Sequence, residues 1–147
     1  MTGQVTLLDF EHSDEDSIVL QHALKTPVEC LLPLPMSLTV LAGCYDNSVK
    51  LIDLRSSGES LSFILNSFTA HQNVVSRLVI DPLAAQNCFF SGSFDSSLKL
   101  WDIRHPARPL IDIRDHTGRV LSLAAAANHV VSGSTDGHLQ LYNRSEM

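Results

Sequence analysis

Short apolar runs separated by polar corners make up most of this chain. In residues 88–104, for example, the run CFFSGS is followed by the corner Phe94 to Ser97 and then by the run LKLWDIR. Two such runs joined by a tight polar corner are typical of an antiparallel β-hairpin. No window shows a sustained 3.6-residue apolar period, so the pattern predicts strands throughout. The alanine-rich run 121–127 favours helix locally, but its place in the pattern predicts a strand there as well.

The hairpin pattern recurs along the chain with a nearly constant period. Its four copies are TGQVTLLDF (2–10), YDNSVKLIDLR (45–55), FDSSLKLWDIR (94–104) and TDGHLQLYNR (135–144). They align without gaps from the corner onward and place Leu8, Ile52, Trp101 and Tyr142 at the same position, 44, 49 and 41 residues apart. A period of about 40 to 45 residues indicates stacked supersecondary units.

Each unit contains more than the hairpin alone. The first hairpin strand recurs as TVLAGC, CFFSGS and HVVSGS, and a further strand precedes it as AHQNVVSRLVID and DHTGRVLSLAAA. His71 and His116 are in phase with these copies. The turns Asp46-Asn47, Asp95-Ser96 and Asp136-Gly137 supply residues that tolerate turn dihedrals. The predicted unit is therefore a four-stranded antiparallel sheet.

With these residues the chain resembles the WD40-repeat family, whose blades are four-stranded antiparallel sheets arranged around an axis. FFSGSFDSSLKLWD matches the family closely, whereas Ile52-Asp53 and Tyr142-Asn143 stand where the family has Trp-Asp. The resemblance implies an all-β partial propeller of about three and a quarter blades. We expect the end of one blade and an acidic loop in 1–17, followed by repeats in 18–60, 61–108 and 109–147.

The resemblance also implies a buried hydrogen-bonded chain that runs in each blade from a histidine through a Ser/Thr and the turn Asp to the Trp position. The matching residues are His71, Ser91 (rather than Ser93), Asp95 and Trp101 in one blade, and His116, Ser132, Asp136 and Tyr142 in the next. The first complete repeat lacks this set, so we expect its blade to be the least rigid. A Ser, a His and an Asp also make up a hydrolase triad. Because the set recurs in the next blade, scaffolding is the favoured interpretation and no catalytic residue is predicted.

Composition narrows the possible ligands. Ten Lys+Arg against sixteen Asp+Glu leave no obvious basic stripe, so direct nucleic-acid binding is not expected. Cys30, Cys44 and Cys88 have no CxxC spacing and are predicted to be core residues, without disulfides, bound metal or cofactor. The apolar stretch 28–45 carries Glu29 and two prolines, so it is predicted to form two buried strands around a proline-containing turn, with no membrane contact.

The number of predicted blades is too small for a closed ring, because propellers have at least four. An open stack would leave apolar blade faces in water, which forgoes hydrophobic free energy. We therefore expect a fragment, a truncated gene product, or a partial propeller completed by missing blades or by another chain.

WD40 propellers act mostly as interaction platforms, which suggests partner-binding residues. Tyr45 and Phe94 precede the turn Asp and are candidate anchors, unless each only covers its own blade. Arg77 stands at a mid-strand position where the next blade has Ser122, so it either pairs with a neighbouring carboxylate or lines the channel and meets a partner.

Within the family, the stretches from LAGCYDNSVKLIDLRSS to VVSGSTDGHLQLY are similar to the C-terminal blades of the WD-repeat subunit of the pescadillo-containing PeBoW complex. This similarity implies a non-catalytic scaffold in large ribosomal subunit biogenesis and rRNA processing. Its implied location is the nucleus or nucleolus, with the cytoplasm as the alternative. The implied partners are pescadillo and the BOP-family WD subunit.

A second resemblance points to a different complex. FFSGSFDSSLKLWDIR is similar to the box by which WD40 substrate receptors dock onto the DDB adaptor of cullin-RING ubiquitin ligases. In that interpretation Arg104 is the charged contact and Arg55 belongs to a degenerate second copy. A WD40-fold hydrolase is a remote third alternative.

Overall fold

A computed structural model describes residues 3–8, 18–35, 38–55, 64–84 and 87–147, which contain thirteen strands in four antiparallel sheets. The first sheet pairs β1 (Gly3–Leu8) with β2 (Ile18–Leu24). The second has the order β3 (Val28–Pro33), β4 (Thr39–Cys44), β5 (Val49–Asp53) and β6 (Ile64–Phe68). The third contains β7 (Val75–Ile80), β8 (Cys88–Ser93), β9 (Leu98–Asp102) and β10 (Ile111–Ile113). The fourth contains β11 (Val120–Ala126), β12 (His129–Ser134) and β13 (Leu139–Asn143), followed by a 3₁₀ turn, Arg144–Glu146.

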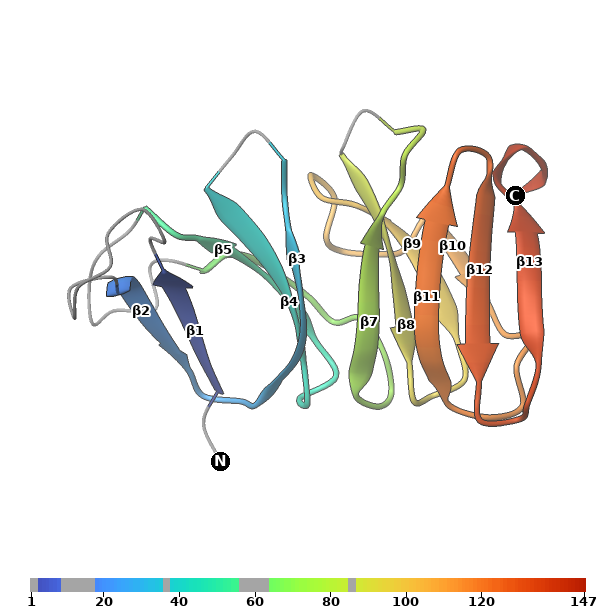
Figure 1. The fold of residues 1–147 in the computed structure, drawn as a ribbon, viewed down its shortest axis with the longest axis horizontal. Helices are drawn as coiled ribbons and strands as arrows, with labels where there is room; N and C mark the ends of the chain where they lie inside the picture. The colour runs from blue at the N-terminus through green and yellow to red at the C-terminus, as the bar shows by residue number, and fades with distance from the viewer. Residues whose placement is uncertain (1–2, 9–17, 36–37, 56–63, 85–86) are drawn as a thin grey trace.

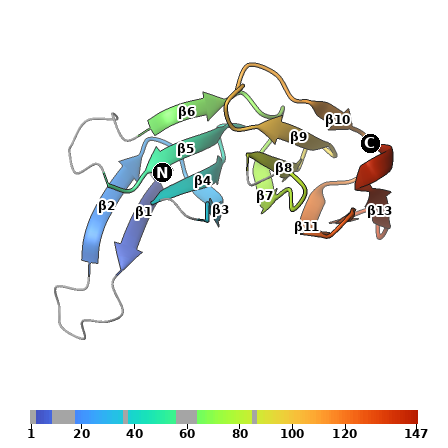
Figure 2. The ribbon, with the colours of Figure 1, turned by 90° about the horizontal axis from the view of Figure 1, so that it is seen from above.

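The sheets stand side by side in chain order, as Figure 1 shows. Seen from above in Figure 2 they follow a curved row, and β7 lies between β3 and β11. Strands within each sheet are connected as an up-and-down meander, because neighbouring strands in each sheet are also neighbours in the chain. The prediction of an all-β partial propeller is therefore confirmed.

Two local strand predictions are confirmed, one of them only in part. Residues 120–126 form β11 despite the helix propensity of alanine, because pairing with β12 satisfies the backbone there. Residues 28–33 and 39–44 form β3 and β4, as predicted for the apolar stretch. The prediction that both are buried is wrong for β3, which is partly exposed along its whole length. Strand alternation explains the exposed positions: Cys30 and Leu32 pack against the apolar cluster shared with the third sheet, whereas Leu31 and Pro33 point to the other face and are exposed.

The three hairpin corners share one backbone conformation. Asn47, Ser96 and Gly137 occupy the same place in the repeat and have φ values of 68°, 71° and 82°. A positive φ is easy for Gly and tolerated by Asn, but it strains a residue with a larger or branched side chain. The corners therefore depend on small or amide-bearing residues at one position.

Substitutions at this corner are expected to have opposite effects in neighbouring blades. Gly137→Ala places a Cβ at a positive φ and should lower the free energy of unfolding by about 1 kcal/mol. Ser96→Gly removes the same strain from the preceding blade and should be neutral or slightly stabilising. Urea unfolding of both variants measures the difference, and equal destabilisation would contradict the strain argument.

Glycines in the second strand of two sheets allow neighbouring sheets to pack closely. A Cβ on Gly43 would lie 2.9 Å from Val75 Cγ1, and a Cβ on Gly92 would lie 2.8 Å from Val120 Cγ1. In both places the valine that begins the next sheet presses against the glycine. Gly43 and Gly92 are therefore inter-blade contacts, whereas the third copy, Gly133, faces Ser122 and Leu139 of its own sheet.

Apolar side chains fill the spaces between consecutive sheets. The second and third sheets enclose a cluster that includes Phe68, Phe89 and Trp101, with Phe68 edge-on to both other rings at 5.3 and 5.6 Å between centroids. A second cluster joins the third and fourth sheets, and a third joins β1 and β2 to the second sheet. Each blade is thus stabilised mainly through its neighbours, as in other repeat architectures.

The outward face of the fourth sheet has no such cover among the described residues. Leu139 and Leu141 are 77% and 66% exposed, whereas Leu98 and Leu100, which hold the same repeat positions one blade earlier, are 0% and 1% exposed. Leu98 and Leu100 are covered by side chains of the fourth sheet, including Val120 and Val130. The predicted open apolar face is therefore present at this end of the row.

The three cysteines all lie in the described ranges and are free thiols. Cys44 and Cys88 are buried, while Cys30 is only partly so. Burial raises the pKa of Cys30 to about 12 and that of Cys44 to about 11, which makes both thiols poor nucleophiles at neutral pH. Among the residues described, no cluster of metal-ligating side chains is found. None of the helical segments within those ranges has the length and apolarity required to cross a membrane.

Candidate functional site

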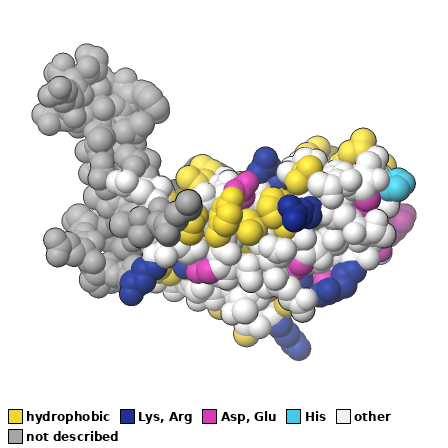
Figure 3. Space-filling view, turned by 90° about the horizontal axis from the view of Figure 1, so that it is seen from below, with side chains coloured by type: hydrophobic (Ala, Val, Ile, Leu, Met, Phe, Trp, Pro, Cys, Tyr) yellow, Lys and Arg dark blue, Asp and Glu magenta, His cyan; other side chains and the backbone are white. Residues whose placement is uncertain are grey.

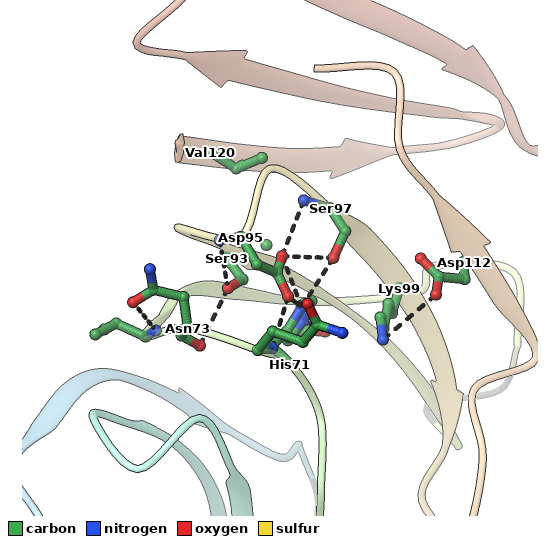
Figure 4. Close-up of polar contacts among 12 residues, drawn as sticks. His71, Asn73, Ser93, Asp95, Ser97, Lys99, Asp112 and Val120 are labelled. Atoms are coloured by element: carbon green, nitrogen blue, oxygen red, sulfur yellow. Dashed lines mark hydrogen bonds and ion pairs between the residues drawn. The ribbon is translucent and has the colours of Figure 1, made fainter. Parts of the chain in front are cut away.

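A hydrogen-bonded chain lies inside the third sheet. The His71 side chain is fully buried, and its Nε2 lies 2.7 Å from Ser91 Oγ. Trp101 Nε1 donates to the same Ser91 Oγ at 2.9 Å. On its other side His71 Nδ1 lies 3.0 Å from Asp95 Oδ2, an arrangement visible in Figure 4. The structure thus brings together all four residues that the resemblance implied for this blade.

Every polar atom in this chain is satisfied when the His71 proton is on Nδ1. That proton is then donated to Asp95, while Nε2 accepts the Ser91 hydroxyl proton. Ser97, which the sequence analysis did not single out, also donates its hydroxyl to Asp95, at 2.6 Å. Burial opposes ionisation of Asp95, but hydrogen bonds from His71, Ser97 and the Gln72 amide outweigh it and hold the pKa of Asp95 well below its ordinary value.

The fourth sheet holds a shorter version of the same chain. His116 Nε2 lies 2.7 Å from Ser132 Oγ, and His116 Nδ1 lies 3.1 Å from Asp136 Oδ2. Tyr142 stands where Trp101 stands, but its buried Oη has no hydrogen-bond partner within the described part of the chain. The implied role of Tyr142 is therefore corrected: an indole N–H projects from the side of its ring, whereas a phenol oxygen projects from the far tip. Burial raises the pKa of Tyr142.

In the second sheet other residues hold the positions of this hydrogen-bonded chain. Ala42 and Ile52 occupy the Ser and Trp positions, and both are fully buried. The turn Asp46 accepts hydrogen bonds from the Ser48 hydroxyl, at 2.5 Å, and from Lys50 Nζ, at 2.7 Å. Lys25 and Thr26 hold the repeat position of the histidine in this blade, and the low rigidity expected for it stays a prediction, to be tested by amide exchange.

The Ser91, His71 and Asp95 connectivity is that of a hydrolase triad, but its surroundings differ. Ser91 is fully buried, and its oxygen already accepts the Trp101 N–H. A nucleophile must reach a bound substrate, and this hydroxyl faces other side chains of its own blade. The arrangement therefore fits the rigidification of a blade better than catalysis.

The depressed carboxyl pKa values predict acid sensitivity. Asp136 has a pKa below its ordinary value, chiefly because the His138 amide donates to it, with further hydrogen bonds from the Thr117 amide and His116. The pKa of the Asp95 carboxyl group is also below its ordinary value. A carboxyl group whose pKa is lower when folded contributes stability that is complete above its unfolded value near 4 and is lost as the pH falls below it. We expect these carboxyl groups to make the free energy of unfolding fall as the pH drops below about 4.

Urea unfolding between pH 3 and 7 measures this dependence. In Asp136→Asn the slope at acid pH should be shallower than in the parent chain, because one linked group has been removed. An unchanged acid slope in that variant would contradict the assignment of the slope to Asp136.

An Asp-x-Arg pair recurs after the third strand of two neighbouring sheets. Asp53 Oδ1 accepts from the Arg55 amide and from Arg55 Nε, both at 2.9 Å, and Asp102 binds Arg104 in the same way. The guanidinium groups remain mostly exposed while the aspartates are nearly buried. Hydrogen bonds from Arg104 hold the pKa of Asp102 well below its ordinary value. The recurrence of Asp-x-Arg in the sequence could have revealed this pairing.

The side chains of the remaining partner-binding candidates differ in exposure and in the contacts they make. Phe94 is covered by the Arg119 guanidinium of the next blade, 5.4 Å from the ring centre, whereas Tyr45 is half-exposed. Arg77 is exposed and donates to the Ser76 carbonyl at 2.6 Å, and it forms no ion pair with any residue that the structure describes. The structure thus does not bring the candidates together at one site.

One inter-blade ion pair was not expected from the sequence. Arg144 Nε donates to the fully buried Asp81 Oδ2 at 3.0 Å and links the turn after β13 to the β7–β8 connection of the third sheet. Only the folded arrangement brings these residues together, because they are 63 positions apart.

The family model "WD domain, G-beta repeat" matches residues 62–102 and 107–143. A Trichoplax adhaerens protein named "Ribosome biogenesis protein WDR12 homolog" is 35% identical over 112 residues, covering 75% of this chain and 26% of that protein. An Ixodes scapularis protein of the same name is 31% identical over 104 residues, covering 70% of this chain and 24% of its own length. The chain therefore spans about a quarter of the length of these relatives.

Solved structures give the same fold. The computationally designed Ika4 protein superposes with a TM-score of 0.76 at 25% identity, covering 96% of this chain and 79% of the designed one. The designed Ika8 protein gives 0.75, with coverage of 96% and 40%. Repeat period, blade architecture and family match agree, and the chain belongs to the WD40 family.

Proposed function

We propose that this chain is a non-catalytic WD40 scaffold that acts in biogenesis of the large ribosomal subunit. The observation that carries the proposal is its similarity, over three quarters of its length, to proteins named as ribosome biogenesis factors. The buried positions of Ser91 and His71, and of Ser132 and His116 one blade later, support a structural role for both triad-like sets found in the described sheets.

The proposed partners follow from the resemblance to the PeBoW subunits. They are pescadillo and the BOP-family WD subunit, and the proposed location is the nucleus and nucleolus. Because the chain corresponds to about a quarter of its relatives, the open face of the fourth sheet is proposed to be completed by further blades or by another chain.

Affinity capture with the tagged chain from a nuclear extract tests the proposal. We expect pescadillo-type assembly factors and precursor large subunits to be recovered above a tag-only control. Arg104→Ala should leave this recovery unchanged. Recovery of neither would overturn the ribosomal role and leave only a generic WD40 scaffold.

One observation favours the second candidate function, docking onto the cullin adaptor. Arg55 and Arg104 are held by their own aspartates with guanidinium edges directed outward, where an acidic partner could bind them. In that case the same capture should recover the DDB adaptor, and Arg104→Ala should abolish the recovery.

A further inference from the structure

The first complete blade contains a pocket that the proposed function does not use. It has a volume of about 530 Å3 and opens beside β2, the connection to β3 and the β4–β5 corner. The residues that line it are Leu24, Lys25, Thr26, Pro27, Tyr45, Asp46, Lys50 and Ile64. Pockets of roughly 300 to 1,000 Å3 are the size that holds small ligands or protruding side chains.

The pocket lies where the next two repeats place their histidine. His71 and His116 bury their imidazoles against the turn aspartates, and the side chains of Asp95 and Asp136 are only 6% and 10% exposed. At the same repeat position Asp46 is 44% exposed, because Lys25 and Thr26 stand in place of the histidine. The hollow is thus a consequence of the missing hydrogen-bonded chain.

The chemistry of the pocket combines an apolar floor with a basic rim. Leu24, Pro27 and Ile64 supply apolar surface, and the half-exposed Tyr45 stands at the edge. The ammonium of Lys50 is neutralised by Asp46. Lys25 is exposed and forms no ion pair with a described residue, so its ammonium is the unpaired charge among the lining residues, while the Glu29 carboxylate, outside the lining, lies by the Tyr45 hydroxyl. On the face that carries the hairpin corners, hydrophobic side chains gather near the middle, with both basic and acidic ones beside them (Figure 3).

We propose that this pocket receives an apolar side chain from an extended partner segment whose flanking residues are acidic. An aliphatic side chain would enter against Leu24 and Ile64 beside the Tyr45 ring, and a flanking carboxylate would meet the Lys25 ammonium. The inference rests on the proposed scaffold role and names the chemistry of one partner segment. Its test uses only the purified chain, so its outcome is separate from the affinity capture above.

The probe is the capped peptide acetyl-GEELEEG-amide, titrated into the 147-residue chain and followed by amide chemical shifts. We expect saturable shifts at Lys25, Tyr45 and neighbouring amides with a Kd of roughly 0.1 to 1 mM. The peptides acetyl-GEESEEG-amide and acetyl-GKKLKKG-amide should bind at least about tenfold more weakly, because each lacks one of the two contacts.

Variants at exposed positions separate the two contacts. Lys25→Glu and Tyr45→Ala should each weaken binding of the leucine peptide about tenfold. Leu83→Ala is the matched control, because Leu83 is equally exposed but lies on the β7–β8 connection. The proposal is overturned if no saturable shift occurs up to millimolar peptide, if the charge-reversed peptide binds equally well, or if both pocket variants bind like the parent chain.

Discussion

Ser91→Ala is expected to lower the free energy of unfolding by about 3 kcal/mol, although it removes one oxygen atom. The Ser91 hydroxyl is the shared partner of His71 Nε2 and of the Trp101 indole N–H. Both groups are buried, and neither can recover a hydrogen bond from water without opening the blade. The lost free energy therefore has three sources: two buried groups left without a hydrogen-bond partner and one small cavity.

Ser132→Ala is the matched variant one blade later. Ser132 bonds His116, whereas the Tyr142 Oη lies near Ser132 without the geometry of a hydrogen bond, so the same change removes one well-formed hydrogen bond instead of two. We expect a loss of about 1 to 2 kcal/mol, measured by the same urea unfolding. Equal losses in the two variants would contradict the two-partner account of Ser91.

The contrast between these serines shows which contacts could be predicted from the sequence and which could not. The resemblance to the WD40 family implied that His71, Ser91 and Trp101 belong to one hydrogen-bonded chain, and their phase in the repeat identified which residues of this sequence fill its positions. The orphan Tyr142 Oη was not predictable in this way. It depends on where a phenol oxygen projects inside a packed core, which is a matter of tenths of an ångström.

Features formed between blades were harder to foresee. The stacking of Arg119 on Phe94 and the Asp81 to Arg144 ion pair join residues from different repeats. Their contact depends on the angle between sheets, which no single repeat encodes. The pocket beside Tyr45 was predictable only in part. The missing histidine was visible in the sequence, but the size of the pocket depends on how β2 packs against β5 and β6.

The exposed leucines of β13 give the second large expected effect. Leu98→Ala should cost about 3 kcal/mol, because Leu98 is fully buried between the third and fourth sheets. Leu139→Ala, at the same repeat position, should cost less than about 0.5 kcal/mol in the isolated chain, because its side chain is already in water. Urea unfolding at low protein concentration compares the two variants directly.

The same face should control association, since an uncovered apolar surface favours contact with any complementary blade. Leu139→Glu combined with Leu141→Glu is expected to abolish binding of an apolar dye and concentration-dependent association, while the unfolding transition of the chain stays nearly unchanged. If Leu139→Ala instead destabilised the isolated chain as much as Leu98→Ala, the fourth sheet would already be covered, and completion by further blades or by another chain would have no surface on which to act.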